Sequence, residues 1–286
     1  MKPPRFAYHE PTTLPEALDI LAQQPGSMAL AGGQSLMPML NFRVVAPEHL
    51  VDLNRIEGLA YIHEQHDAVA IGAMTRQREL EFSPVIAKRL PLLAEAIHEV
   101  GHRQTRNRGT IGGSLCHLDP AAELPCIAMA HNAELTISRA DGSRTIAMRD
   151  FAKGLMTTDL GPGELLVEVR LKPWPAGHGW SFLEYARRRG DFAVVSVAVL
   201  VKLDASERIE RLTATFGGIA HAPVQIDAAE MGLIGAAPDV ASGRLASAAG
   251  ALPALEDPIY PSWYRQQIAG AFAARAFAKA VERVTK

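Results

Sequence analysis

Apolar and polar positions in the first fifth of the chain predict a small α/β unit. Thr13 and Glu16 fit a capping box, so a helix is expected to begin at Leu14 and to end before Pro25. The apolar positions of this helix recur at helical spacing and are Leu14, Ala17, Leu18, Leu21 and Ala22. Short apolar runs at 28–31 and 49–53 predict two strands, with a short helix beginning near residue 36 between them.

The middle of the chain predicts a second α/β unit. Paired strands are expected at 61–63 and 68–73, and a helix over 84–100 that Pro91 kinks. Asp141-Gly142 lies between two alternating runs and predicts a tight hairpin. A further strand is expected over 165–171, and the Pro-rich stretch 172–175 marks a boundary.

The last third predicts a different architecture, with long apolar strands followed by helices. The strand candidates are 182–187, 192–203 and 209–219, and a terminal helix is expected over 264–284. The chain is therefore predicted to have an α+β fold with three domains, at 1–54, 55–175 and 176–286.

Two glycine turns carry the most specific chemistry. Ala31–Ser35 and Thr110–Ser114 each pair adjacent glycines with a polar residue, and each is expected to follow a strand. Glycine allows positive φ and close approach to the backbone, and successive turn N–H groups form an anion-binding nest. Each turn alone is more often an ordinary tight turn. Together they favour one doubly charged ligand, such as a dinucleotide pyrophosphate, held between two backbone clamps.

Composition narrows the class of protein. The chain is 48% hydrophobic and 21% charged, as soluble globular proteins are, and its net charge of −2 favours neither nucleic acid nor an anionic membrane. No signal peptide is visible, and no apolar run reaches the roughly 18 residues of a membrane-spanning helix. Cys116 and Cys126 are too few to ligate an iron–sulfur cluster. A cytoplasmic protein without a cluster of its own is expected.

Several other functions lack their motifs. Neither glycine turn is a G-x-G-x-x-G fingerprint or a P-loop, and no G-x-S-x-G elbow is present. His98 and His102 have the i, i+4 spacing of zinc ligands but lack the glutamate of H-E-x-x-H, so no metal site is predicted.

In combination, these segments resemble the FAD-binding medium subunits of molybdenum hydroxylases, a family that includes carbon monoxide, nicotine, quinoline and caffeine dehydrogenases. The resemblance is carried by residues 31–35 (AGGQS), 107–114 (NRGTIGGS), 117–125 (HLDPAAELP) and 187–193 (RRRGDFA). Tyr264-Arg265 in the terminal helix also fits the family, so the resemblance runs nearly end to end.

The resemblance implies a vanillyl-alcohol-oxidase-type FAD fold of two α/β subdomains, followed by a C-terminal α+β domain. FAD would be held noncovalently by the N–H groups of the two turns, and Glu123 stands where many relatives have an aspartate that contacts ribose. Asp191 and Phe192 would lie near the isoalloxazine, with Leu165 or Leu166 against the ring. The implied FAD-binding residues are Ala31, Gly32, Gly33, Gln34, Ser35, Leu36, Thr110, Ile111, Gly112, Gly113, Ser114, His117, Asp119, Glu123, Leu165, Leu166, Asp191 and Phe192.

The same resemblance implies a role in electron transfer rather than in substrate hydroxylation. A large subunit would hold the molybdenum cofactor, a small subunit two [2Fe-2S] clusters, and this chain the FAD that passes electrons to an external acceptor. A heterotrimer or a dimer of heterotrimers is expected. Two other readings stay open: a self-contained flavin oxidoreductase of the same fold, and a non-catalytic nucleotide- or anion-binding module.

Overall fold

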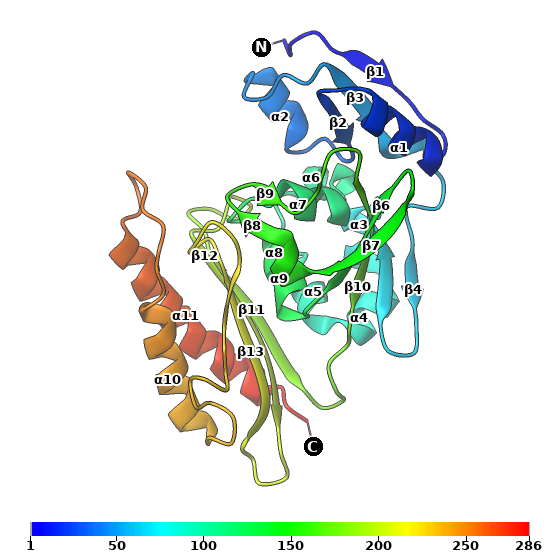
Figure 1. The fold of residues 1–286 in the computed structure, drawn as a ribbon. Helices are drawn as coiled ribbons and strands as arrows, with labels where there is room; N and C mark the ends of the chain where they lie inside the picture. The colour runs from blue at the N-terminus through cyan, green and yellow to red at the C-terminus, as the bar shows by residue number, and fades with distance from the viewer. Residues whose placement is uncertain (1, 286) are drawn as a thin grey trace.

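A computed structural model describes residues 2–285 of the chain, which form three units along its length (Figure 1). The first unit is a parallel three-stranded sheet in the order β1-β3-β2, built from Ala7–His9, His49–Asp52 and Ser27–Leu30. Helices α1 (Leu14–Gln23) and α2 (Leu36–Asn41) connect the strands. The Thr13 side chain accepts a hydrogen bond from Glu16 N at 3.3 Å, which confirms the predicted helix start.

The second unit contains an antiparallel five-stranded sheet in the order β4-β5-β10-β6-β7. Its strands are Ile62–Glu64, Val69–Gly72, Leu165–Leu171, Glu134–Arg139 and Gly142–Ala147, so the predicted hairpin at Asp141-Gly142 is confirmed. The remaining elements are η1 (Leu53–Arg55), α3 (Gln77–Phe82), α4 (Pro84–Arg89), α5 (Pro91–Ala96), α6 (Arg103–Arg108), α7 (Ile111–His117), α8 (Glu123–Ala130), α9 (Met148–Phe151), β8 (Ala152–Gly154) and β9 (Thr157–Thr158).

The segment 84–100 is largely helical and is interrupted at Pro91, as expected, although Pro91 divides it into α4 and α5 and α5 ends at Ala96. Proline has this effect because it donates no backbone hydrogen bond and crowds the preceding turn. One local prediction in this unit is wrong. The segment before the second glycine turn is helix α6 rather than a strand, and the turn itself begins helix α7. The arginines of 103–108 favour a helix as readily as a loop, and no apolar alternation supports a strand there.

The third unit is an antiparallel sheet in the order β11-β12-β13-β14, followed by two long helices. The strands are Gly179–Tyr185, Val195–Leu203, Ile209–Gly217 and Val224–Ile226, and the helices are α10 (Pro238–Gly250) and α11 (Ser262–Glu282). Figure 1 shows α10 and α11 on the side of this sheet that faces away from the second unit.

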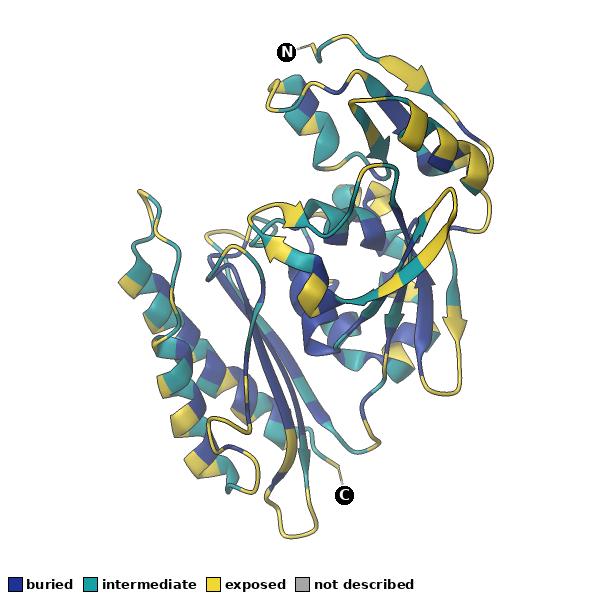
Figure 2. Cartoon of the chain, in the orientation of Figure 1, coloured by how far each residue is buried: buried dark blue, intermediate teal, exposed yellow. Residues whose placement is uncertain are grey.

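Both faces of the third sheet are buried, as the dark strands of Figure 2 show. Val197 and Val199 pack with α10 and α11, whereas Phe182, Ala198 and Leu200 belong to the core of the second unit. Burial on two sides explains why the sequence of β12 is a continuous apolar run rather than an alternating one.

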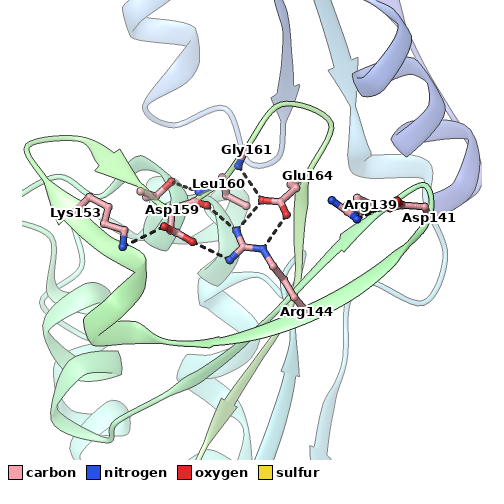
Figure 3. Close-up of polar contacts among 9 residues, drawn as sticks. Arg139, Asp141, Arg144, Lys153, Asp159, Leu160, Gly161 and Glu164 are labelled. Atoms are coloured by element: carbon pink, nitrogen blue, oxygen red, sulfur yellow. Dashed lines mark hydrogen bonds and ion pairs between the residues drawn. The ribbon is translucent and has the colours of Figure 1, made fainter.

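A network around Arg144 fixes the loop that leads into β10 (Figure 3). The Arg144 guanidinium donates to Glu164 Oε1 at 2.8 Å and to Asp159 Oδ2 at 2.8 Å, and it also reaches the Asp159 carbonyl. Glu164 Oε2 accepts from Gly161 N at 2.8 Å, and hydrogen bonding to Arg144 lowers the pKa of Glu164. Within this loop, a Cβ added at Gly163 would lie 3.3 Å from Ala22, so the loop packs closely against α1.

Candidate functional site

The first glycine turn presents a row of backbone donors with no acceptor in the protein. Between β2 and α2, none of the N–H groups of residues 32–36 donates a hydrogen bond to any of residues 2–285. Gly33 has φ +71, a conformation that favours glycine and turns successive N–H groups toward one point. Five such donors form a nest that a phosphate or diphosphate would satisfy.

A cavity of about 360 Å³ lies beside this turn. Its lining residues are Leu30, Ala31, Gly32, Gly33, Gln34, Met37, Pro38, Asp52, Asn54 and Arg108. The unpaired donors therefore belong to the walls of a hollow that a ligand can enter.

The structure brings the two glycine turns together. A Cβ added at Gly32 would lie 2.3 Å from the carbonyl oxygen of Arg108, and one added at Gly113 would lie 3.5 Å from Ala31 Cβ. Gly112 is as confined, because its Cβ would lie 2.6 Å from Ala73 Cβ. Glycine is required at Gly32 and Gly112 because the backbones meet more closely than any side chain allows.

The N–H groups of residues 111–114 in the second turn, unlike those of the first turn, have acceptors within the protein. Ile111 N donates to Thr75 O at 3.1 Å and Gly112 N donates to Ala73 O at 2.9 Å. The Thr110 side chain caps α7 by accepting from Gly113 N at 3.1 Å, and Ser114 N donates to Thr110 O at 3.2 Å. The glycine pattern alone did not show which turn keeps its N–H groups free, and the contacts of residues 110–114 with FAD stay predictions.

A polar network that sequence reasoning missed holds the turns in register. Asn54 Nδ2 donates to Ala31 O at 2.9 Å, and Arg76 donates to Asn54 Oδ1 at 2.6 Å and to Arg108 O. Asp52 accepts from Asn54 N at 2.9 Å and from Tyr8. The sequence did contain a signal, since Asp52 ends β3 and Asn54 follows it, as the first turn follows β2. The carboxyl ends of adjacent parallel strands meet at one edge of a sheet, where ligands bind.

Arg108 supplies the cavity with a positive charge. Its side chain has no hydrogen-bond or ion-pair partner among residues 2–285. The pKa of Arg76 is lowered by burial and by the nearby Arg108 cation, so the two guanidinium groups lie close enough to repel. An anion in the cavity would relieve this repulsion.

The predicted residues after the second turn have separate surroundings. His117 ends α7 and is half-buried. Asp119 Oδ1 accepts from Ala121 N at 2.9 Å, which makes a local turn; it does not cap a helix at Pro120, because α8 begins at Glu123. Glu123 is 6% exposed, and burial, aided by the carboxylates of Asp119 and Glu99, raises the pKa of Glu123 to about 7.

The four residues expected at the flavin ring, Leu165, Leu166, Asp191 and Phe192, are not among the described residues that line the 360 Å³ cavity. Leu165 packs in the small core between the first two units, and Leu166 packs in the core of the second unit. Asp191 accepts an ion-pair hydrogen bond from Arg188 at 3.1 Å, and Phe192 is 70% exposed in the loop before β12. The contacts of these residues with a flavin stay predictions.

Two searches of the described part of the chain bear on other functions. No helix in it is long and apolar enough to cross a membrane. No group of three or more His, Cys, Asp or Glu side chains within residues 2–285 is arranged to hold a metal ion.

Two protein-family models match the chain, one after the other. Residues 4–174 match the family described as the FAD binding domain in molybdopterin dehydrogenase, and residues 180–280 match the CO dehydrogenase flavoprotein C-terminal domain. Both descriptions agree with the resemblance seen in the sequence.

Full-length relatives and solved structures agree with these matches. The chain is 39% identical to the 6-hydroxypseudooxynicotine dehydrogenase complex subunit alpha of Paenarthrobacter nicotinovorans, over 99% of this chain and 97% of that protein. It is 35% identical to the glyceraldehyde dehydrogenase medium chain of Sulfolobus acidocaldarius, over 97% and 99%. A carbon monoxide dehydrogenase chain of Hydrogenophaga pseudoflava superposes with a TM-score of 0.96 at 37% identity, covering 100% of both chains. The predicted α+β, FAD-binding fold is confirmed.

Proposed function

Because the chain belongs to the family of FAD-binding medium subunits of molybdenum hydroxylases, we propose that it carries electrons from a [2Fe-2S] partner subunit to an external acceptor. FAD, when bound, would supply the redox chemistry, because a flavin accepts electrons one at a time and releases two to an acceptor. The unpaired N–H row of residues 32–36 beside Arg108 carries the proposal, since these groups fit the diphosphate of a noncovalently held FAD.

In this proposal the chain's own residues bind and orient the cofactor. The first turn and Arg108 hold the diphosphate, the second turn forms the adjoining wall, and Glu123 accepts from ribose. Phe192, Asp191 and one of the two leucines 165 and 166 flank the isoalloxazine. Electrons would arrive from a small iron–sulfur subunit, and a large molybdenum subunit would oxidise the organic substrate. The complex would be a cytoplasmic heterotrimer or a dimer of heterotrimers, with domains at 1–54, 55–175 and 176–286 of this chain.

The proposal is tested by producing the chain alone and together with its iron–sulfur and molybdenum partner subunits. We expect a yellow protein whose flavin is released by acid and identified as FAD. Its flavin should be reduced when the complete complex meets its organic substrate, and should not be reduced by that substrate in the isolated chain. Direct reduction of the isolated chain would instead favour a self-contained flavin oxidoreductase, and a colourless chain would favour a nucleotide- or anion-binding module.

Arg108→Ala is expected to weaken FAD binding about tenfold, because a charge-assisted hydrogen bond to a phosphate contributes roughly 1.5 kcal/mol. Equilibrium dialysis of the chain with FAD measures the change, and the affinity of the variant should depend less on salt than that of the wild type. Arg108→Lys is the matched control, since it keeps the charge and should retain most of the affinity. Equal affinity in wild type and Arg108→Ala would remove Arg108 from the site.

Phe192→Ala is expected to increase the rate at which oxygen reoxidises the reduced flavin, without loss of bound FAD. The exposed ring at Phe192 would no longer cover the flavin, so the reoxidation rate should rise by roughly twofold to tenfold. Stopped-flow absorbance of the reduced complex measures this rate. Phe42→Ala, which also removes a 70% exposed ring but in the first unit, is the control. An unchanged rate together with a lower melting temperature would assign Phe192 a purely structural role.

A further inference from the structure

A second hollow lies between the second unit and the loop that precedes β12. It has a volume of about 230 Å³ and is lined by His98, Gly101, His102, Arg103, Arg106 and Arg189. Five of these residues come from one stretch, the turn after α5 and helix α6, and Arg189 comes from the 186–192 loop. Two segments that are far apart in sequence therefore meet at one small space.

The lining is strongly basic, and only part of its charge is compensated. Arg106 is paired with Glu81, to which its Nε and Nη2 donate at 3.0 and 3.2 Å, and His98 lies 3.5 Å from the same carboxylate. Arg103 and Arg189 have no hydrogen-bond or ion-pair partner among residues 2–285, and no acidic side chain lines the hollow. At least two guanidinium charges therefore face one cavity uncompensated, an arrangement that an anion stabilises.

The chemistry of the lining selects the kind of anion. It contains no large apolar side chain, so an acyl chain would find no complementary surface. Guanidinium groups present planar, paired donors that match the oxygen atoms of phosphate. We propose that this hollow binds the phosphate group of a small anion, either inorganic phosphate or the phosphoryl group of a nucleotide.

The position of the hollow links such a ligand to the loop that carries Phe192. Gly190 has φ +83, and a Cβ there would lie 2.3 Å from His102 Cε1, so the loop rests directly on the imidazole. A phosphate held by Arg103 and Arg189 would join α6 to this loop three residues before Phe192. On the proposed function, phosphate binding would then restrain the loop beside the flavin; the phosphate site itself does not depend on FAD.

Calorimetric titration of the FAD-loaded chain with inorganic phosphate, against sodium chloride of equal ionic strength, tests the site. Bound FAD occupies the first glycine turn, so phosphate cannot bind there. We expect Arg103→Gln and Arg189→Gln each to raise the phosphate Kd at least about tenfold, the loss of one charge-assisted hydrogen bond. Arg187→Gln is the matched control because Arg187 lies in the same loop, is exposed and does not line the hollow; its Kd should change less than about twofold.

A second series of titrations, with AMP and with adenosine, distinguishes a nucleotide phosphate from free phosphate. Tighter binding of AMP than of phosphate, lost in Arg189→Gln, would identify a nucleotide, and equal binding would identify a free anion; adenosine should not bind. No saturation below about 10 mM phosphate, or equal affinity in all three variants, would overturn the site. The site would also be overturned if Arg189→Gln weakened only the binding of an acidic protein partner and not that of phosphate. A chain that binds no FAD would refute the proposed function alone, because the comparison of Arg189 and Arg187 variants still decides the phosphate site.

Discussion

Replacing Gly32 by alanine is expected to abolish most FAD binding while the chain remains folded. The new methyl group would lie 2.3 Å from the carbonyl oxygen of Arg108, which is backbone and cannot rotate away. The two glycine turns must therefore separate, and the N–H row of residues 32–36 loses its alignment with Arg108. Losing about two charge-assisted hydrogen bonds corresponds to a loss of roughly 100-fold or more in affinity.

Equilibrium dialysis with FAD measures the affinity, and urea unfolding measures the accompanying loss of stability, expected at about 1–3 kcal/mol for an overpacked site. Gly154→Ala is the matched control, since a Cβ there meets no atom within 4 Å. If Gly32→Ala bound FAD as tightly as Gly154→Ala does, the proposed diphosphate site would lie elsewhere.

The turns and their surroundings show how far the sequence predicts the site. Paired glycines at two distant positions predicted a shared site, and the structure places Gly32 against Arg108 and Gly113 beside Ala31. Apolar periodicity placed β10 and β12 to within a few residues, because most of their side chains are buried.

Local sequence could not say which turn keeps its N–H groups free. Two donors of the second turn, Ile111 N and Gly112 N, are paired with the carbonyls of Thr75 and Ala73, which lie after a strand about 40 residues earlier. The supporting contacts of Arg76 with Asn54 and Arg108 are equally non-local. Hydrogen-bond partners from distant segments depend on the whole fold. A motif therefore identifies the residues near a ligand but does not show which of their N–H groups are free to bind it.

Two carboxyl groups, one on α8 and one on β11, lead to the second large prediction. Glu123 is almost fully buried, and Glu184 on β11 has an Oε2 atom that is buried and lacks a partner among the described residues. Burial, with smaller contributions from neighbouring carboxylates, raises the pKa of Glu123 to about 7 and that of Glu184 to about 8. The charged neighbours of the pair are Asp119, Glu99 and Arg106, of which only Arg106 is a cation.

The stability of the chain is therefore expected to fall as pH rises from about 5.5 to 8.5. In the unfolded chain both groups titrate near their ordinary value of 4.5, so over this range the folded state binds more protons than the unfolded state. The stabilisation is complete below that value and is lost as pH rises through 7 and 8, where two negative charges must be held in one poorly solvated interface. The two pKa shifts correspond to roughly 5 kcal/mol over this range, which solvent screening of the partly buried Glu184 reduces to about 3 kcal/mol.

Urea unfolding of wild type and of Glu123→Gln/Glu184→Gln at the two pH values isolates this contribution. The double variant keeps the shape of both side chains but cannot ionise, so its stability should fall about 3 kcal/mol less than that of the wild type between the two pH values. His131, whose pKa burial lowers to about 4, acts in the opposite direction in both proteins and cancels in the comparison. Glu210→Gln, an exposed position on β13, should follow the wild type. A double variant with the pH dependence of the wild type would mean that both carboxyl groups ionise freely in the folded chain, and the interface between α8 and the third sheet would then have to be open to water.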